Sequence, residues 1–413
     1  MAAPQSAGRR IGVATIDQAI SGASNVLIAI LAARVLGVES FGLFGIAFLV
    51  YVLAQGAARA LVGEPLLLHP AEAEEKPGEM IGSGIILGVV LGVLVVAAGL
   101  LAHVWDGRLG NALIALGVFF PFLVLQDLGR YLGFATRRPE SALTLDVTWL
   151  VLQLGAITML FVTGADALWE FIVAWAGSGA VAGLLVFWQH RRSPIRLSVT
   201  WLASTWSYSW RYLVSYTSTQ GSGLLAAVLL GAIAGAKALG AVQGALLLQR
   251  PFMTVQAAVI ASSVGEISRR ATEREYVRSM VRRLTILTAS VAFVNGVILL
   301  TLPDAVGRAV LGDTWAETND LLWPTATQIL LLGLMTGFRT GVLGMRRVDK
   351  AVVIDIGTTI AALVLSVGGA IVGGAEAALW GAVISNAAGL VVWTVVFSRL
   401  SPAEAEPAPV DGR

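Results

Sequence analysis

The chain has 413 residues, of which 56% are hydrophobic and 13% are charged. Soluble globular domains carry roughly 25% charged residues, so this chain has too few charges to cover a surface that faces water. With a mean hydropathy of +0.79, the composition excludes a soluble enzyme and predicts a polytopic membrane protein. The formal net charge of only +2 gives no reason to expect a nucleic-acid partner.

Several kinds of chemistry are absent from the sequence. There is no Cys, which excludes disulfides and Cys-ligated metal sites, and the three His are scattered along the chain. No G-x-x-x-x-G-K-[ST], H-E-x-x-H or G-x-S-x-G motif occurs. We therefore expect no metal site, no cofactor and no enzymatic activity.

Twelve apolar runs are long enough to cross a bilayer, which takes about 20 residues per helix. In chain order they cover about 14–35, 41–63, 80–103, 110–134, 141–163, 168–189, 211–233, 239–263, 284–306, 319–343, 351–372 and 375–397. The runs are too long for membrane β-strands and do not alternate between apolar and polar residues. The sequence therefore predicts an all-α membrane protein with about twelve transmembrane helices.

The loops alternate in their content of Lys and Arg. One set is rich in them, and its largest groups are the pair 137–138, the segment 191–196 and the loop 268–283. The other set carries only Arg34, Arg108, Lys237 and Arg308. Since cytoplasmic loops are enriched in Lys and Arg, we expect a multi-pass protein of the plasma (cytoplasmic) membrane with both termini in the cytoplasm.

An internal repeat relates the fourth and fifth runs to the tenth and eleventh. The sequence RYLGFATRRPESALTLD at 130–146 returns as RTGVLGMRRVDKAVVID at 339–355, a constant offset of 209. The first Arg, the twin Arg and the last Asp of the two copies coincide. A weaker match joins LGVESFG at 36–42 to AGAKALG at 234–240. The chain thus reads as a duplication.

The repeat predicts the domain organisation. We expect an N-terminal six-helix lobe at 1–196, a C-terminal six-helix lobe at 197–400 and a disordered cytoplasmic tail at 401–413. Because six spans is an even number, both lobes have the same orientation in the membrane. Parallel repeats of this kind are typical of transporters that carry substrate through a central cavity between the halves.

Charged residues inside the predicted spans need a reason, because each costs about 2.5–3.5 kcal/mol on insertion scales. The candidates are Asp17, Arg59, Glu64, Asp127, Arg130, Asp146, Arg211, Arg250, Arg339 and Asp355. A structural role and a functional role are both open for most of them.

The repeated charges favour a structural role. Arg130 with Asp146, and Arg339 with Asp355, can form buried pairs that hold the two equivalent hairpins. Asp127 lies three residues before Arg130 and shares its helix face. Arg59, near the end of its span, can extend toward the interface, as long basic side chains do.

Arg250 and Asp17 favour a functional role. Neither has an obvious partner one turn away in its own span. Arg250 lies deepest in the membrane and precedes Pro251, which removes a helix hydrogen bond and can open a kink.

The first two runs resemble a known family. Residues 16–53, IDQAISGASNVLIAILAARVLGVESFGLFGIAFLVYVL, are similar to the opening of polysaccharide flippases of the multidrug/oligosaccharidyl-lipid/polysaccharide exporter superfamily. The closest part is A-R-x-L-G-x-x-x-F-G at 33–42. The length, the twelve spans and the two six-helix halves are similar as well.

The resemblance implies a transporter that flips a polyprenyl-pyrophosphate-linked oligosaccharide from the inner to the outer leaflet for polysaccharide biosynthesis, by alternating access. It also implies cationic residues in a central cavity. From their chemistry and depth we expect Arg250, then Arg59, Arg339 and Arg130, to bind the substrate. Asp17 and Asp127 are the candidates for ion coupling. The expected partners are the lipid-linked glycan, membrane lipid and other polysaccharide-assembly proteins.

Other functions stay open at this stage. The main alternative is a cation-coupled exporter of drugs or small molecules from the same superfamily, with Asp17 and Asp127 as cation sites. A membrane scaffold or enzyme is a third hypothesis. A major-facilitator transporter also has two parallel halves of six spans, but the acidic loop at 64–79 lacks its signature.

Overall fold

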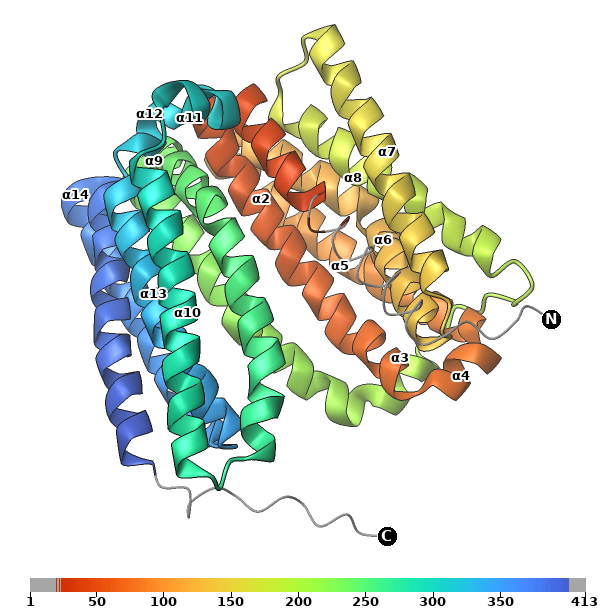
Figure 1. The fold of residues 1–413 in the computed structure, drawn as a ribbon. Helices are drawn as coiled ribbons and strands as arrows, with labels where there is room; N and C mark the ends of the chain where they lie inside the picture. The colour runs from red at the N-terminus through yellow and green to blue at the C-terminus, as the bar shows by residue number, and fades with distance from the viewer. Residues whose placement is uncertain (1–19, 21, 23, 401–413) are drawn as a thin grey trace. The chain divides into compact units, whose positions relative to one another are not determined.

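The computed structural model describes residues 20, 22 and 24–400, and every regular element in them is helical (Figure 1). A first apolar helix covers Ser24–Val35. It is followed by α2 (Gly37–Ala58), the π-helix η1 (Arg59–Gly63), α3 (Glu64–Leu68), α4 (Pro70–Glu75), α5 (Pro77–Trp105), α6 (Gly107–Ala135), α7 (Pro139–Thr163), α8 (Leu168–Gln189), α9 (Thr200–Arg269), α10 (Arg274–Leu300), α11 (Asp304–Leu311), α12 (Thr314–Asn319), α13 (Leu322–Gly344) and α14 (Val348–Arg399). The predicted all-α fold is confirmed.

The described residues contain nine helices that are long and apolar enough to cross a membrane. Two of these nine, in α9 and α14, are interrupted by residues with non-helical backbone angles. Each therefore holds two of the predicted spans. Together with the shorter helix Ser24–Val35, the helices account for all twelve spans.

α14 is a hairpin of two helices. Gly374 has a φ of 66°, in the left-handed region that glycine adopts readily, and the chain reverses there. Beyond the turn the two arms pack together, since the Ser385 hydroxyl donates to the Thr358 carbonyl at 2.9 Å. The predicted spans 351–372 and 375–397 are these two arms, shown in blue in Figure 1.

The break in α9 lies where the sequence predicted a connection between two spans. The interruption is at Gly235, with a φ of 88°, whereas the backbone angles at Pro251, where the sequence suggested a kink within one span, remain helical. Membrane helices tolerate proline where neighbouring groups satisfy the freed carbonyl. Gly235 lies between the predicted spans 211–233 and 239–263, so the break separates two spans.

The chain divides into two compact units, Met1–Ala227 and Val228–Arg413. The predicted lobe boundary, between residues 196 and 197, stays a prediction. In the first unit α6 packs against α2, α5, α7 and α8, and in the second unit α13 packs against α10 and α14. Each unit is thus organised around one central helix, and the repeat matches α6 to α13.

Small residues bring these helices close together. A Cβ added to Gly92 of α5 would lie 2.7 Å from the carbonyl oxygen of Gly117 in α6. In the second unit, a Cβ on Gly337 of α13 would lie 2.7 Å from the carbonyl oxygen of Val281 in α10. Such close backbone approach is how helices associate in lipid, where no hydrophobic force drives them together.

The turns of the repeat have the same unusual backbone in both units. Arg137 (φ 57°) and Arg346 (φ 61°) are the two non-glycine residues of the described chain with positive φ. In each turn the next residue bonds back to the helix, with Arg138 N–H donating to Gly133 O at 2.7 Å and Arg347 N–H donating to Val342 O at 3.2 Å. This is the pattern of a Schellman helix end. The duplication therefore extends to backbone geometry.

Candidate functional site

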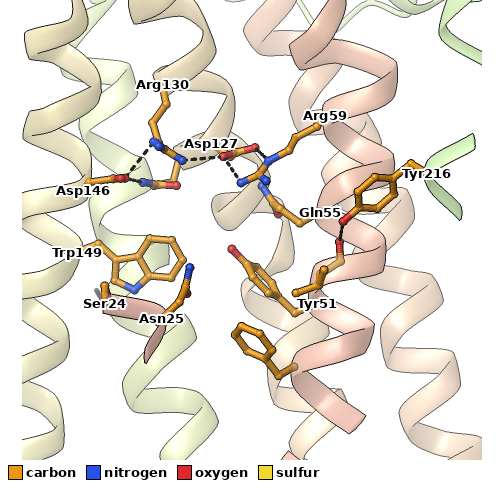
Figure 2. Close-up of a pocket in the computed structure, with 13 residues that line it drawn as sticks. Ser24, Asn25, Tyr51, Gln55, Arg59, Asp127, Arg130, Asp146, Trp149 and Tyr216 are labelled. Atoms are coloured by element: carbon orange, nitrogen blue, oxygen red, sulfur yellow. Dashed lines mark hydrogen bonds and ion pairs between the residues drawn. The ribbon is translucent and has the colours of Figure 1, made fainter. Parts of the chain in front are cut away.

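A row of alternating charges crosses the first unit from α2 to α7 (Figure 2). Arg59 begins η1 directly after α2, Asp127 and Arg130 lie on α6, and Asp146 lies on α7. They meet because α6 packs against both α2 and α7. We call these four residues the charge network.

Arg59 binds Asp127 with both arms of its guanidinium. Nε lies 2.7 Å from Oδ2, and Nη2 lies 2.9 Å from Oδ1. A bidentate fork of this kind is among the strongest arginine–carboxylate geometries. The Arg59 side chain is 40% exposed and that of Asp127 only 6%. Arg59 is therefore turned toward α6, and it is the accessible member of the pair.

Arg130 lies between two carboxylates. Its Nη1 is 3.3 Å from Oδ1 of Asp127, and its Nε is 3.2 Å from Oδ1 of Asp146. Gln126 also donates to that Asp146 oxygen, at 2.8 Å. The Arg130 side chain is 6% exposed. The predicted pair of Arg130 with Asp146 is confirmed, and so is the shared face of Asp127 and Arg130.

The charge network contains two cations and two anions. Its formal charge is therefore zero, so it does not present the excess of positive charge that an anion site needs by itself. Removing one partner of a buried pair leaves an uncompensated charge and costs about 3–5 kcal/mol. The two inner residues, Arg130 and Asp146, fit a structural role, whereas Arg59 has access to a ligand.

A cavity of about 100 Å³ adjoins the network. It is lined by Ser24, Asn25, Phe48, Tyr51, Val52, Gln55, Arg59, Gln126, Asp127, Arg130, Asp146, Trp149 and Tyr216. Every one of these residues belongs to the first unit. In Figure 2 the rings of Tyr51 and Trp149 and the amide of Gln55 lie beside the charged groups. Aromatic rings and amides give this cavity the means to hold a polar group.

Gln55 has unused hydrogen-bonding capacity in this cavity. Its side chain is 2% exposed, and its Nε2 donates a long bond of 3.5 Å to the Leu123 carbonyl. Its Oε1 is buried without a hydrogen-bond partner. A buried acceptor that is left unpaired costs about 1–3 kcal/mol, so a donor that enters the cavity gains by binding here.

Sequence reasoning missed Tyr51, Gln55 and Trp149. A signal for the first two was present, because Tyr51, Gln55 and Arg59 are spaced by four residues and such a row shares one helix face. Trp149 lies three residues after Asp146, on the same face of α7. Reading polar and aromatic residues outward from each intramembrane charge would have found all three.

The second unit holds one ion pair at the equivalent place. Arg339 on α13 contacts Asp355 on α14 three times, at 3.1, 3.2 and 2.9 Å. The predicted pair is confirmed, but its side chains are 32% and 39% exposed. At this offset Asp127 corresponds to Thr336. In the first unit Asp127 contacts both Arg59 and Arg130, and in the second unit a threonine hydroxyl takes its place.

The second unit has a neutral hydrogen bond at the position equivalent to the Arg59–Asp127 ion pair. Gln256 of α9 donates through Nε2 to the Thr336 hydroxyl at 2.7 Å and to the Leu332 carbonyl at 3.4 Å. By the repeat offset, Leu332 corresponds to Leu123 and Thr336 to Asp127. Gln256 thus contacts both of these positions, whereas in the first unit Gln55 contacts Leu123 and Arg59 contacts Asp127.

Two of the remaining predicted residues, Arg250 and Arg339, belong to the second unit. Arg250 is half-buried on α9 in the second unit, where its neighbour Gln249 donates to Gln328 at 3.2 Å. Within the first unit the structure brings together Arg59, Arg130 and Asp127. Asp17 lies outside the described residues.

The described residues include no group of three or more His, Asp or Glu side chains that could hold a metal ion. The carboxylates of the charge network instead bind guanidinium groups.

The sequence profile of a family described as "Polysaccharide biosynthesis protein" matches residues 30–320. The chain belongs to this family. Its long apolar helices make this family member a multi-pass membrane protein. No sequence among the curated proteins matches it.

Solved structures share the fold. An inward-facing multidrug-resistance MATE family transporter of the MOP superfamily is 17% identical, with a TM-score of 0.68 over 91% of this chain and 93% of that chain. The lipid II flippase MurJ, in an inward closed conformation, is 12% identical, with a TM-score of 0.67 over 93% of this chain and 87% of the other.

A third solved structure is a MOP superfamily transporter from Pyrococcus furiosus, whose title reports a reversed polarity of its binding pocket. It is 17% identical, with a TM-score of 0.58 over 94% of this chain and 93% of that chain. Identities this low show the fold alone. These structures confirm the architecture of about twelve helices that the sequence predicted, and the family match confirms the predicted relation to polysaccharide biosynthesis proteins.

Proposed function

We propose that this family member flips a polyprenyl-pyrophosphate-linked oligosaccharide from the inner to the outer leaflet by alternating access. The observation that carries the proposal is the match over residues 30–320 to a family described by polysaccharide biosynthesis. One protein with this fold is named a lipid II flippase. This name supports a lipid-linked substrate for the present chain as well. Other polysaccharide-assembly proteins are the proposed partners.

Arginine is the proposed partner of the pyrophosphate. A guanidinium stays ionised when buried and binds phosphate through two parallel hydrogen bonds. Arg250, Arg59, Arg339 and Arg130 are the proposed residues. Arg59 is the member of the charge network that a substrate can reach, because it is 40% exposed whereas Arg130 is 6% exposed.

The carboxylate of Asp127 and the pyrophosphate of the substrate then compete for the guanidinium of Arg59. When the pyrophosphate takes Arg59, Asp127 loses its bidentate partner and keeps only the 3.3 Å contact to Arg130. A buried carboxylate with less compensation favours a proton or a cation. This exchange links the substrate to ion coupling at Asp127, for which Asp17 is the second proposed residue.

The cation-coupled exporter is the alternative function. In that function a cation binds at Asp127 and its entry drives the export of a drug. Arg59 then has a structural role. A MATE transporter also shares this fold. The family match favours the flippase, because it concerns polysaccharide biosynthesis.

The proposed direction of transport requires the Arg-rich loops to face the cytoplasm. Tags placed at 70–78, 190–196 and 346–350 should then be cytoplasmic, and tags at 104–110 and 310–316 should be external. Access to the loop 268–283 from outside would contradict this orientation.

The proposed function can be tested in vesicles that contain the purified chain and a labelled polyprenyl-pyrophosphate oligosaccharide. An impermeant glycosidase outside the vesicles reports each molecule that crosses. We expect transport by the wild type, loss of transport in Arg250→Ala, and partial activity in Arg250→Lys, because a point charge lacks the planar fork.

The control is Arg308→Ala, which removes a charge from α11, at the loop expected to be external. It should transport as the wild type does. Full transport by Arg250→Ala would remove Arg250 from the site. Transport of a cationic dye with no movement of the lipid-linked glycan would favour the exporter.

A further inference from the structure

A second cavity lies at one end of the first unit, away from the charge network. It has a volume of about 770 Å³. Its lining comes from α4, the start of α5, the α6–α7 turn, the start of α7, the end of α8 and the segment that follows it: Ala73, Glu74, Pro77, Thr136, Arg138, Ser141, Trp188, Gln189, His190, Arg191, Arg192 and Ser193. We call it the basic cavity, since three arginines and one carboxylate line it.

The walls of the basic cavity are fixed by backbone contacts. The turn that carries Arg138 is closed by its bond to Gly133, and the Ser141 hydroxyl donates to the Arg138 carbonyl at 2.7 Å. On the other side, the Gln189 amide donates to the Ser141 carbonyl at 3.1 Å. The end of α8 is thereby joined to the α6–α7 turn.

The segment after α8 is held against α5. Arg196 N–H donates to the Gly78 carbonyl at 3.4 Å, and the Ser83 hydroxyl donates to the Ser198 carbonyl. A Cβ added to Gly82 would collide with the Arg196 carbonyl. The extended segment therefore fits against small residues of α5, and the basic cavity is an ordered part of the unit.

The positive charge in this cavity is not neutralised within the described chain. Arg138, Arg191 and Arg192 form no ion pair with any described carboxylate. Arg191 instead lies over the Trp188 ring, with its Cζ 5.7 Å from the centroid. Burial and the neighbouring Arg138 lower the pKa of His190 below its usual value, as expected where the local potential is positive.

The apolar surface beside the cavity continues along α8. Trp188, Leu184 and Val181 are 63%, 46% and 52% exposed. They are spaced by four and three residues, so they form one row on the helix. The row begins at the cavity, because Trp188 lines it, and its exposed apolar side chains suit contact with acyl chains. A ligand that joins a phosphate to acyl chains matches both features.

We propose that the basic cavity binds the phosphodiester headgroup of an anionic glycerophospholipid, with its acyl chains along the α8 row. Arginine suits a phosphate because of its fork of donors. Basic pockets between membrane helices are a known form of headgroup site. This proposal does not depend on the proposed transport function, because it concerns a bound lipid and not the transported one.

The test is native mass spectrometry of the full chain in detergent, with phosphatidylglycerol and phosphatidylcholine added in separate titrations. Both lipids carry a phosphodiester, but only phosphatidylglycerol has a net negative charge. We expect one phosphatidylglycerol to be bound at least tenfold more tightly than phosphatidylcholine. Added inorganic phosphate should compete weakly, since it lacks acyl chains.

The variant is the triple change Arg138→Gln, Arg191→Gln and Arg192→Gln. It should lose at least tenfold in affinity for phosphatidylglycerol. The matched control removes three charges from one helix of the second unit, with Arg278→Gln, Arg282→Gln and Arg283→Gln on α10, where all three side chains are exposed. Its affinity should change less than twofold.

Three results would overturn the proposal: equal binding of the two lipids, an equal loss in the control, or competition by inorganic phosphate at the same concentration as the lipid. The last would assign the cavity to a soluble phosphate. If the triple variant does not fold, Arg192→Gln alone gives the test, with an expected loss of at least threefold. Unchanged affinity in that variant would also contradict the site.

Discussion

The two units keep the same hairpin but use it differently. In the first unit, the Arg130–Asp146 pair is buried and extends through Asp127 to Arg59 on a third helix. In the second unit, the Arg339–Asp355 pair is about one-third exposed, and the contact to the third helix is a neutral bond from Gln256 to Thr336.

The difference separates what the hairpin needs from what the site needs. An arginine and an aspartate between the two helices occur in both units, so the pair belongs to the hairpin. A charged link to a third helix occurs only in the first unit among the residues described here. A neutral hydrogen bond can join the helices as well, so the ionised form of that link points to a function beyond packing.

The largest effect expected from this comparison is on stability. Arg130→Met leaves the buried carboxylate of Asp146 without its cationic partner and should lower the free energy of unfolding by about 3–5 kcal/mol. Arg339→Met removes the partner of a partly exposed acid and should cost about 0–1 kcal/mol. Thermal unfolding of the two purified variants in the same detergent measures both values. Equal losses would show that the difference in burial has no energetic consequence.

The second effect is on substrate binding, and it depends on the proposed function. Arg59→Gln should raise the KM for the lipid-linked glycan about tenfold, the effect of one charge-assisted bond of roughly 1.4 kcal/mol. Asp127→Asn should lower KM because the fork is freed, while turnover falls because the exchange is lost. Vesicle transport at varied substrate concentration separates the two parameters.

The control for this effect comes from the second unit. Thr336→Ala removes the hydroxyl that occupies the position of Asp127. It should leave KM within twofold of the wild type. If Thr336→Ala changes KM as much as Asp127→Asn does, the charged link is not special to the first unit.

The smallest expected effect concerns a feature that the two units share. Arg137 and Arg346 both have a left-handed backbone, which costs a residue with a Cβ about 1–2 kcal/mol. The free energy of unfolding of Arg137→Gly should therefore be about 1 kcal/mol higher than that of Arg137→Ala, because only alanine has a Cβ. Both variants lose the same charge, so the comparison isolates the backbone. The same comparison at 346 should give the same difference. Unequal differences would show that the turns are held by unequal surroundings.

Much of the fold could be predicted from hydropathy alone. The bounds of α8 coincide with the predicted span 168–189, because polar residues flank an unbroken apolar run. The pairs at Arg130 and Arg339 followed from their repetition at a constant offset. Both predictions used patterns that can be read from the sequence without knowing which distant segments pack together.

The rest of the site depends on packing between distant segments. Arg59 and Asp127 are 68 residues apart, and no local pattern indicates which face of α2 meets α6. The left-handed turn at Arg137 had no signal either, since glycine is the residue expected there. The sequence also suggested a kink at Pro251, but the backbone angles of α9 remain helical there.

The π-helix η1 has a consequence for the spacing of contacts along the membrane. Arg59 meets Asp127, and five residues later Glu64 accepts a 3.4 Å bond from Tyr131, four residues along α6. In a regular α-helix, five residues turn by about 500° and would place Glu64 about 140° away from Arg59. The wider turn of a π-helix brings both side chains to the same neighbour. The one extra residue in the turn of η1 thus lets Arg59 and Glu64, five residues apart, both contact α6 residues that are four apart.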